Sequence, residues 1–206
     1  MGLKKFDLKF SEVLQGDFGL EELNLILVFQ VNCPGCFAYA LPLAIRIHQE
    51  FREKGLNVLA LSTAFEDFDL NTVGNTLRLL DNGHIVGETR KVLERAGYST
   101  FPLKIPFDVA FDQVVPNDPS YLEEDIKTFC AKHPELDIDK SQETASIKDQ
   151  LKEYFLRKSY RAHTFSANHL NGTPSWILCD RQKNLLYESF GHKKYERMAH
   201  ILEKFL

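Results

Sequence analysis

The most constraining feature of the sequence is the stretch from residue 24 to residue 42, NLILVFQVNCPGCFAYALP. It opens with five apolar residues, 25–29, whose lack of polar alternation is typical of a central strand buried on both faces. Cys33 and Cys36 follow, and Pro34 between them fits the first position of a helix, where a missing N–H is tolerated. The stretch therefore predicts a buried strand, a turn with two cysteines, and a helix.

The position of the two cysteines predicts their chemistry. Cys33 is expected at the N-cap, where unpaired backbone N–H groups and the positive end of the helix dipole favour a thiolate. Cys36 is expected one turn further along the same face, within reach of Cys33. A strand, a Cys-x-x-Cys box and a helix start, in this order, indicate a redox site in an intracellular protein.

These residues resemble the active site of the thioredoxin-like superfamily, in particular its TlpA-like and AhpC/TSA-like redoxin domains. The matching pieces are the strand LILVFQ, the box Cys33-Pro34-Gly35-Cys36, Pro42 within the next helix, and Gly172-Thr173-Pro174. The resemblance implies an α/β thioredoxin fold, with a central mixed sheet between two layers of helices. It also implies a cis peptide bond before Pro174, in a loop that faces the cysteines.

At 206 residues the chain suits a single domain, residues 1–206. Residues 1–23 read as an N-terminal extension, in which FDLKF and FGLEEL are expected to pair as a hairpin. Residues 113–169 depart most from the family and read as a helical insertion before the cis-proline loop. The remaining pattern predicts helices at 34–54, 71–80, 84–96 and 192–205, and strands at 56–63, 105–112, 175–180 and 184–190.

The resemblance implies thiol–disulfide oxidoreductase activity and assigns a role to four residues. Cys33 is the expected nucleophile, and Cys36 is the thiol that resolves the mixed disulfide. Thr173 and Pro174 are the expected substrate-binding residues, because a cis-proline presents a backbone edge to an extended substrate. No cofactor is expected.

Two departures from the family pattern concern proton transfer and the surroundings of Cys33. Asn32 stands where a tryptophan commonly precedes the first cysteine, and Leu27 stands where thioredoxin has a buried acid. A carboxylate of the FEDFD loop, Glu66 or Asp67, is the candidate replacement as proton acceptor. Solvated loop carboxylates without such a role are the alternative.

Other functions for the cysteines are a zinc site, a peroxidase and an inert relic of the fold. A zinc site usually needs a second Cys or His pair at ligand spacing, whereas Cys130 and Cys179 are isolated. A peroxiredoxin-like peroxidase has Pro-x-x-x-Thr-x-x-Cys, and alignment on Cys36 puts Phe29 and Cys33 at the proline and threonine positions. The non-enzyme alternative is a binding module that docks a partner through residues 113–169.

The composition of the chain disfavours some classes of binding partner. A net charge of -4 disfavours nucleic acid and anionic membranes, and the sequence has no apolar run of membrane-spanning length, about 20 residues. The N-terminal residues lack the apolar region of a signal peptide, so a cytoplasmic location is expected. The expected partners are a protein or small-molecule disulfide and a reducing partner of the thioredoxin or glutathione type.

Overall fold

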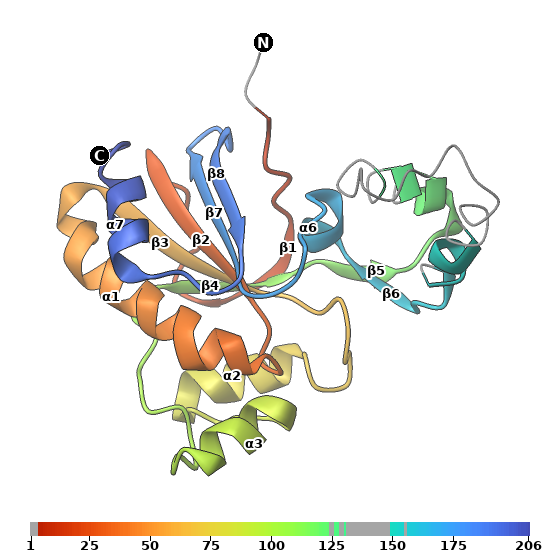
Figure 1. Ribbon diagram of the computed structural model, residues 1–206, viewed down its shortest axis with the longest axis horizontal. Helices are drawn as coiled ribbons and strands as arrows, with labels where there is room; N and C mark the ends of the chain where they lie inside the picture. The colour runs from red at the N-terminus through yellow and green to blue at the C-terminus, as the bar shows by residue number, and fades with distance from the viewer. Residues whose placement is uncertain (1–3, 124–125, 128–129, 131–148, 155) are drawn as a thin grey trace.

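The computed structural model describes residues 4–123, 126–127, 130, 149–154 and 156–206. Its main sheet has six strands in the order β1-β4-β3-β2-β7-β8 (Figure 1). The strands are β1 (Phe10–Gln15), β2 (Leu23–Phe29), β3 (Leu56–Ser62), β4 (Asp108–Asp112), β7 (Ser175–Asp180) and β8 (Leu185–Phe190). β2, β3 and β4 are parallel, whereas β1, β7 and β8 pair antiparallel with their neighbours, so the sheet is mixed as expected.

The strand β2 lies inside this sheet, between β3 and β7, and all seven of its residues are buried. Leu25, Leu27 and Phe29 pack into the core on one face of the sheet. Ile26 and Val28 pack into the core on the opposite face. Successive side chains of a strand point to opposite faces, so an uninterrupted apolar run fits a strand with a core on both sides.

The two faces of the main sheet are covered by different kinds of structure. Four helices contribute residues to the core that contains Leu25: α1 (Leu41–Phe51), α2 (Val73–Asn82), α3 (Gly87–Arg95) and α7 (Tyr195–Leu202). The opposite core is closed by Phe6, Phe18 and Leu170, with Phe165 of the short helix α6 (His163–Ala167) packed against it. The expected second helix layer is therefore formed mainly by extended chain.

The helix after the cysteines begins at Pro34, as predicted, but its first turns are wide. Residues Cys36–Ala40 (η1) form a π-helix in which the Leu41 N–H donates to the Cys36 carbonyl. Pro42 has no N–H for the usual bond to residue 38, and its ring crowds that carbonyl, which explains the widened turn. After α1, a 3-10 turn (η2, Arg52–Lys54) ends at Gly55, whose φ of 95° is left-handed.

The N-terminal hairpin is not formed. β1 pairs antiparallel with β4, with Phe10 opposite Asp112, and covers the edge of the sheet. The chain then turns at Gly16, and the backbone N–H groups of Asp17 and Phe18 donate to the Asp108 carboxylate at 3.2 and 2.9 Å. These donors are thus used by a side chain, and the strand partner of β1 comes from a distant part of the sequence.

The segment predicted as a helical insertion, 113–169, begins with a β-strand and ends with a β-strand followed by the short helix α6. β5 (Val114–Pro116) and β6 (Tyr160–Ala162) form a separate antiparallel pair that extends away from the main sheet (Figure 1). The 3-10 turn η3 (Pro119–Tyr121) follows β5, and residues 149–154 are helical. Of the two expected helical stripes, 122–130 and 147–155, the described residues 122–123, 126–127, 130 and 149–154 are helical, and the others lie outside the described residues. Among the helices described, none has the length and apolar character needed to cross a membrane.

Candidate active site

The two cysteines of the box lie together at the start of the helix, at the end of the chain segment that follows β2. Both thiols are free; Cys33 is partly exposed and Cys36 is completely buried. The Cys36 thiol donates to the Cys33 sulfur over 2.7 Å, and the Cys36 backbone N–H donates to the same sulfur over 3.3 Å. The first sulfur therefore accepts hydrogen bonds while remaining accessible, and the second is shielded behind it.

This arrangement shifts the pKa values of the two thiols in opposite directions. The hydrogen bond from Cys36 lowers the pKa of Cys33 to about 6, helped by Thr173 and backbone N–H groups and opposed by burial. Burial raises the pKa of Cys36 well above its usual value, and the adjacent Cys33 adds to the increase. At neutral pH the accessible sulfur is a thiolate and the buried one a thiol, which are the forms needed for attack and later resolution.

The cis-proline loop faces these sulfurs, as the resemblance implies. The peptide bond between Thr173 and Pro174 is cis. The Thr173 carbonyl lies 3.5 Å from the Cys33 sulfur. Gly35 approaches the same loop, since a Cβ atom added there would lie 3.9 Å from Pro174 Cδ. The structure thus brings Cys33, Cys36, Thr173 and Pro174 into one site.

Glu66 is placed differently from these four residues. It lies in the loop after β3, and the residue as a whole is exposed. Partial desolvation of its carboxyl group and the neighbouring Asp67 charge raise the pKa of that carboxyl. The groups that dominate the pKa values of the two cysteines do not include Glu66. Its backbone carbonyl instead accepts hydrogen bonds from the Gln30 and Asn71 amides at 3.4 and 2.9 Å. The role of its carboxylate as a proton acceptor stays a prediction.

Sequence reasoning missed Gln30, which is 1% exposed immediately after β2. Its amide oxygen accepts a hydrogen bond of 3.0 Å from the Thr173 hydroxyl. The backbone of Gln30 also lowers the pKa of the Cys36 thiol, against the larger effect of burial. The sequence did contain a signal for this contact: Gln30 is a lone amide at the end of an apolar run, and a buried amide requires hydrogen-bond partners.

The two remaining cysteines are not part of this site. Cys179 is buried in β7, and burial raises its pKa to about 12. Cys130 is a free, partly exposed thiol within residues 113–169. Within the described part of the chain, no three His, Cys, Asp or Glu side chains are grouped to hold a metal ion.

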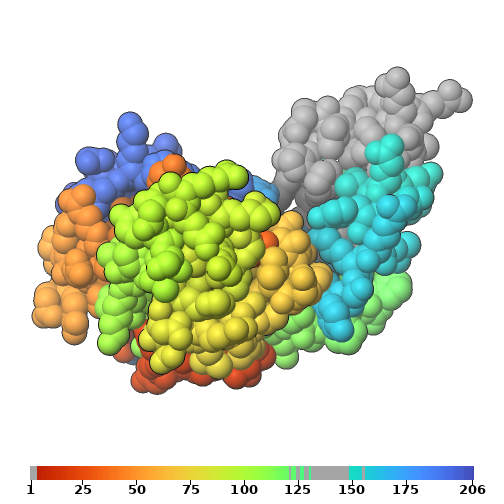
Figure 2. Space-filling view, turned by 90° about the horizontal axis from the view of Figure 1, so that it is seen from below, coloured from red at the N-terminus to blue at the C-terminus, as the bar shows by residue number. Residues whose placement is uncertain are grey.

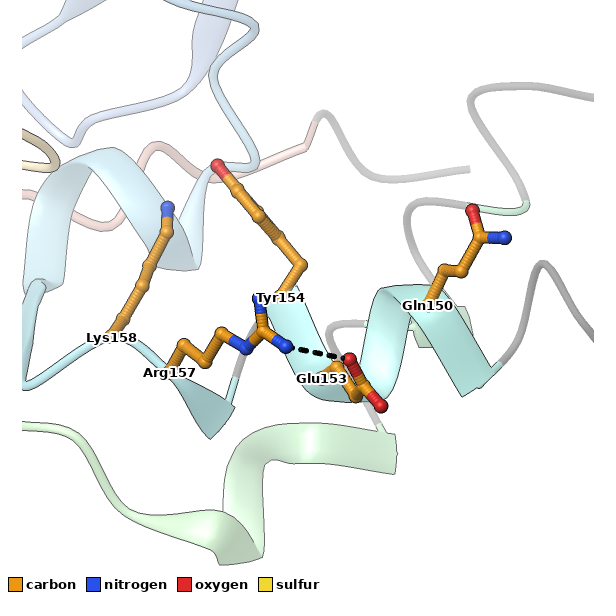
Figure 3. Close-up of a pocket in the computed structure, with 5 residues that line it drawn as sticks. All are labelled: Gln150, Glu153, Tyr154, Arg157 and Lys158. Carbon is orange, nitrogen blue, oxygen red and sulfur yellow. Dashed lines mark hydrogen bonds and ion pairs between the residues drawn. The ribbon is translucent and has the colours of Figure 1, made fainter.

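A separate pocket lies in the 113–169 segment, and neither Cys33 nor Cys36 lines it. Figure 3 shows its lining by Gln150, Glu153, Tyr154, Arg157 and Lys158. Arg157 pairs with Glu153 at 2.9 Å, and the Lys158 ammonium lies 4.5 Å from the centre of the Tyr154 ring. These ionic and cation–π contacts are exposed, so each stabilises the local structure only weakly.

Comparison with known proteins supports the fold. The sequence matches no family model and no curated protein. Among solved structures, the chain is similar to a thiol-disulfide isomerase from Corynebacterium glutamicum (20% identity, TM-score 0.62, 99% of this chain, 96% of that chain). It is also similar to a thioredoxin-like superfamily protein (19% identity, TM-score 0.56, 98% and 96% covered). The chain therefore has the fold of the thioredoxin-like superfamily.

Proposed function

We propose that this protein is a thiol–disulfide oxidoreductase that works through Cys33 and Cys36. The observation that carries the proposal is the pair of free sulfurs 2.7 Å apart, of which only Cys33 is accessible. An accessible thiolate next to a shielded thiol is suited to two successive displacements. The solved structure named as a thiol-disulfide isomerase, which shares this fold, agrees with the proposal.

In the first displacement the Cys33 thiolate attacks one sulfur of a substrate disulfide. A bond forms between Cys33 and that sulfur, the substrate disulfide breaks, and the other substrate sulfur leaves as a thiolate that takes a proton from solvent. In the second displacement Cys36 passes its proton to solvent, and its thiolate attacks the Cys33 sulfur to form the Cys33–Cys36 disulfide. The mixed disulfide breaks, the second substrate thiolate leaves, and two electrons have passed from the dithiol to the substrate.

The cis-proline loop would orient the substrate for this exchange. Pro174 has no N–H, so the backbone beside Cys33 offers carbonyl groups to an extended chain without a competing donor at that position. A protein or small-molecule disulfide is the proposed substrate. A thiol or dithiol reductant of the thioredoxin or glutathione type would return Cys33 and Cys36 to the reduced state.

The decisive experiment equilibrates the protein in graded thiol–disulfide buffers and counts free thiols by mass after alkylation. We expect the wild type to lose two of its four thiols together in one reversible transition. The Cys33→Ser variant should lose that transition, whereas Cys36→Ser should accumulate a mixed disulfide on Cys33. Cys130→Ser is the matched control and should retain the wild-type midpoint.

Two outcomes would redirect the proposal. If Cys33 and Cys36 never pair in oxidising buffer, the dithiol mechanism is wrong and a redox-inert binding module becomes the better hypothesis. If the reduced protein consumes hydrogen peroxide faster than it reduces disulfides, with loss of activity in Cys33→Ser, a thiol-dependent peroxidase replaces it.

A further inference from the structure

The three residues of the cis-proline loop are held in different ways. The Gly172 carbonyl accepts from the Ser175 hydroxyl at 2.7 Å, and the Pro174 carbonyl accepts from the Gly191 backbone N–H at 2.8 Å. Among the described residues, no backbone group hydrogen-bonds to the N–H or the carbonyl of Thr173, which lies between these two. The Thr173 backbone is therefore available to a substrate, and its side chain supplies the hydrogen bond that holds it.

The partner of that side chain is the amide of Gln30. The Thr173 hydroxyl donates to the Gln30 amide oxygen at 3.0 Å. Gln30 is 1% exposed and comes immediately after the buried strand β2, so it is anchored in the centre of the molecule. Its amide nitrogen donates to the Glu66 carbonyl at 3.4 Å. The amide thus connects the cis-proline loop to the end of β2 and to the loop after β3.

This connection ends beside the nucleophile, since the Thr173 carbonyl lies 3.5 Å from the Cys33 sulfur. Two reacting groups combine fast only when they are held close together in the right orientation, and a shift of about 1 Å can slow a reaction roughly 100-fold. A loop that is free to shift would therefore slow the reaction of a substrate that lies along it. A substrate that reaches the sulfur without lying along the loop would not be affected.

We propose that Gln30 is a positioning residue of the dithiol site: its amide holds the Thr173 hydroxyl and thereby fixes the backbone edge on which an extended substrate is aligned for attack by Cys33. The inference rests on the proposed function and adds a residue to it. The hydrogen bonds of the Gln30 side chain go to Thr173 and Glu66 rather than to a sulfur. Its effect is therefore confined to substrates with a peptide chain around the disulfide.

The test compares two disulfide probes that share one leaving group. The first is a peptide of about eight residues whose central cysteine carries a 2-thiopyridyl group, and the second is methyl 2-pyridyl disulfide, which has no peptide chain. The Cys33 thiolate attacks the peptide or methyl sulfur, a mixed disulfide with Cys33 forms, and the probe disulfide breaks. The 2-thiopyridone that leaves takes its proton from solvent and is followed by its absorbance.

All proteins in the comparison carry Cys130→Ser, which removes the other partly exposed thiol of the described residues, and Cys33→Ser gives the background. The rates are measured at a pH of about 8. A thiol with a pKa of about 6 is almost completely ionised there, so a small change in the pKa of Cys33 does not alter the rate.

We expect Gln30→Leu, which removes the acceptor, to slow the peptide probe roughly fivefold to tenfold and the methyl probe by less than about twofold. Thr173→Val removes the donor and should produce the same selective loss. The double variant should lose no more than Thr173→Val alone, because both substitutions break one hydrogen bond. Gln30→Glu keeps an oxygen for the Thr173 hydroxyl and should retain most of the wild-type rate.

Three results would overturn the proposal. Equal slowing of both probes in Gln30→Leu would mean general damage to the site. An unchanged peptide rate would mean that the loop is held without the amide, and additive effects in the double variant would mean that Gln30 does not act through Thr173. If Gln30→Leu fails to fold, the same bond is tested from its other end: Thr173→Ser must keep the wild-type ratio of the two rates, and Thr173→Val must lower it.

The readout also separates this inference from the proposed function. Release of 2-thiopyridone reports only the first displacement by Cys33 and needs no disulfide between Cys33 and Cys36. Failure of the two cysteines to pair in oxidising buffer would therefore refute the dithiol mechanism, and the ratio of the two probe rates would still decide the role of Gln30.

Discussion

At the scale of single residues, Asn32 shows how the turn before Cys33 is held in place. Its backbone N–H donates to the Asn71 side chain at 2.9 Å, and its amide nitrogen donates to Asp67 at 2.8 Å. Its amide oxygen accepts from the Glu88 backbone N–H, at the start of α3, at 2.7 Å. Asn32 thus connects the turn before Cys33 to two neighbouring segments by hydrogen bonds.

We expect Asn32→Ala to lower the free energy of unfolding by about 1–3 kcal/mol, since the Asp67 carboxylate and the Glu88 backbone N–H both lose a partner. Urea unfolding monitored by tryptophan fluorescence measures the change. Gln49→Ala, on an exposed position of α1, is the control and should change the value by less than about 0.5 kcal/mol. Equal effects of the two substitutions would contradict the role given to Asn32.

The depressed pKa of Cys33 predicts how its reactivity depends on pH. A thiol with a pKa of about 6 is a thiolate above that pH, so alkylation by iodoacetamide should rise with pH around a midpoint near 6 and then level off. Because the Cys36 thiol is the largest cause, Cys36→Ala should raise the midpoint by about 1 unit or more. Cys179→Ala is the control and should leave the midpoint unchanged. If Cys36→Ala also leaves the midpoint unchanged, the low pKa of Cys33 comes from the helix start rather than from Cys36.

At the scale of elements, the loop after β3 connects the cysteine site to the base of the 113–169 segment. Phe65 stacks on Phe165 of α6, with ring centres 3.9 Å apart and planes 9° from parallel. Phe68 packs against Tyr160 of β6, with ring centres 5.5 Å apart. Figure 2 shows this loop lying against the β6 segment on the surface. Through the Glu66 carbonyl the same loop reaches Gln30.

The buried carboxylate of Asp112 anchors α6 from the other side. It accepts hydrogen bonds from the Thr63 hydroxyl at 2.7 Å and from the backbone N–H groups of Thr164 and Phe165 at 2.8 and 3.1 Å. Burial raises the pKa of this carboxyl, and its hydrogen bonds oppose the increase. Asp112 thereby fixes the start of α6 to the ends of β3 and β4.

Removing the ring of Phe165 should loosen this connection. We expect Phe165→Ala to lower the free energy of unfolding by about 1–3 kcal/mol, less than a fully buried phenylalanine because the side chain is only partly buried. Backbone amides of residues 64–70 should also exchange hydrogen faster. Phe205→Ala, at an exposed C-terminal position, should produce neither effect, and unchanged exchange in Phe165→Ala would contradict the coupling.

At the scale of the whole molecule, the 113–169 segment is connected to the main sheet through a narrow base. β5 and β6 pair from Val114 opposite Ala162 to Pro116 opposite Tyr160. The Asn117 N–H then donates to the Ser159 carbonyl at 3.1 Å, which continues the ladder by one step. Two antiparallel strands can be closed by a two-residue turn, so the geometry allows a much shorter connection.

We therefore expect that replacing residues 118–158 with Asn-Gly leaves a folded protein whose dithiol midpoint equals that of the wild type. The main sheet, Cys33, Cys36 and the cis-proline loop all lie outside the replaced residues. Circular dichroism and the redox titration measure the two properties. Loss of the Cys33–Cys36 couple in a folded shortened protein would mean that the replaced residues support the site; activity lost only toward protein disulfides would assign them to substrate docking.

Much of the central architecture could be predicted from the sequence, because its causes are local. The apolar run 25–29, Pro34 and Gly55 act within one strand or one helix, and each element formed where expected. The strand at 175–180 also formed with its predicted bounds. The cysteine pair was predictable from spacing, and the facing loop at Thr173 and Pro174 from the family resemblance.

The remaining features depend on residues that are far apart in sequence, and only the tertiary structure decided them. β1 pairs with β4, which is far away in sequence, and the backbone N–H groups of Asp17 and Phe18 donate to the Asp108 carboxylate. Gln30 meets Thr173 across 143 positions of sequence, so no local pattern announces the contact. Sequence by itself determined the central strands, the helix that follows the cysteines and which two sulfurs meet, since those follow from neighbouring residues. Tertiary structure decided which distant polar groups surround the sulfurs, because burial forces each one to find a partner wherever the fold supplies it.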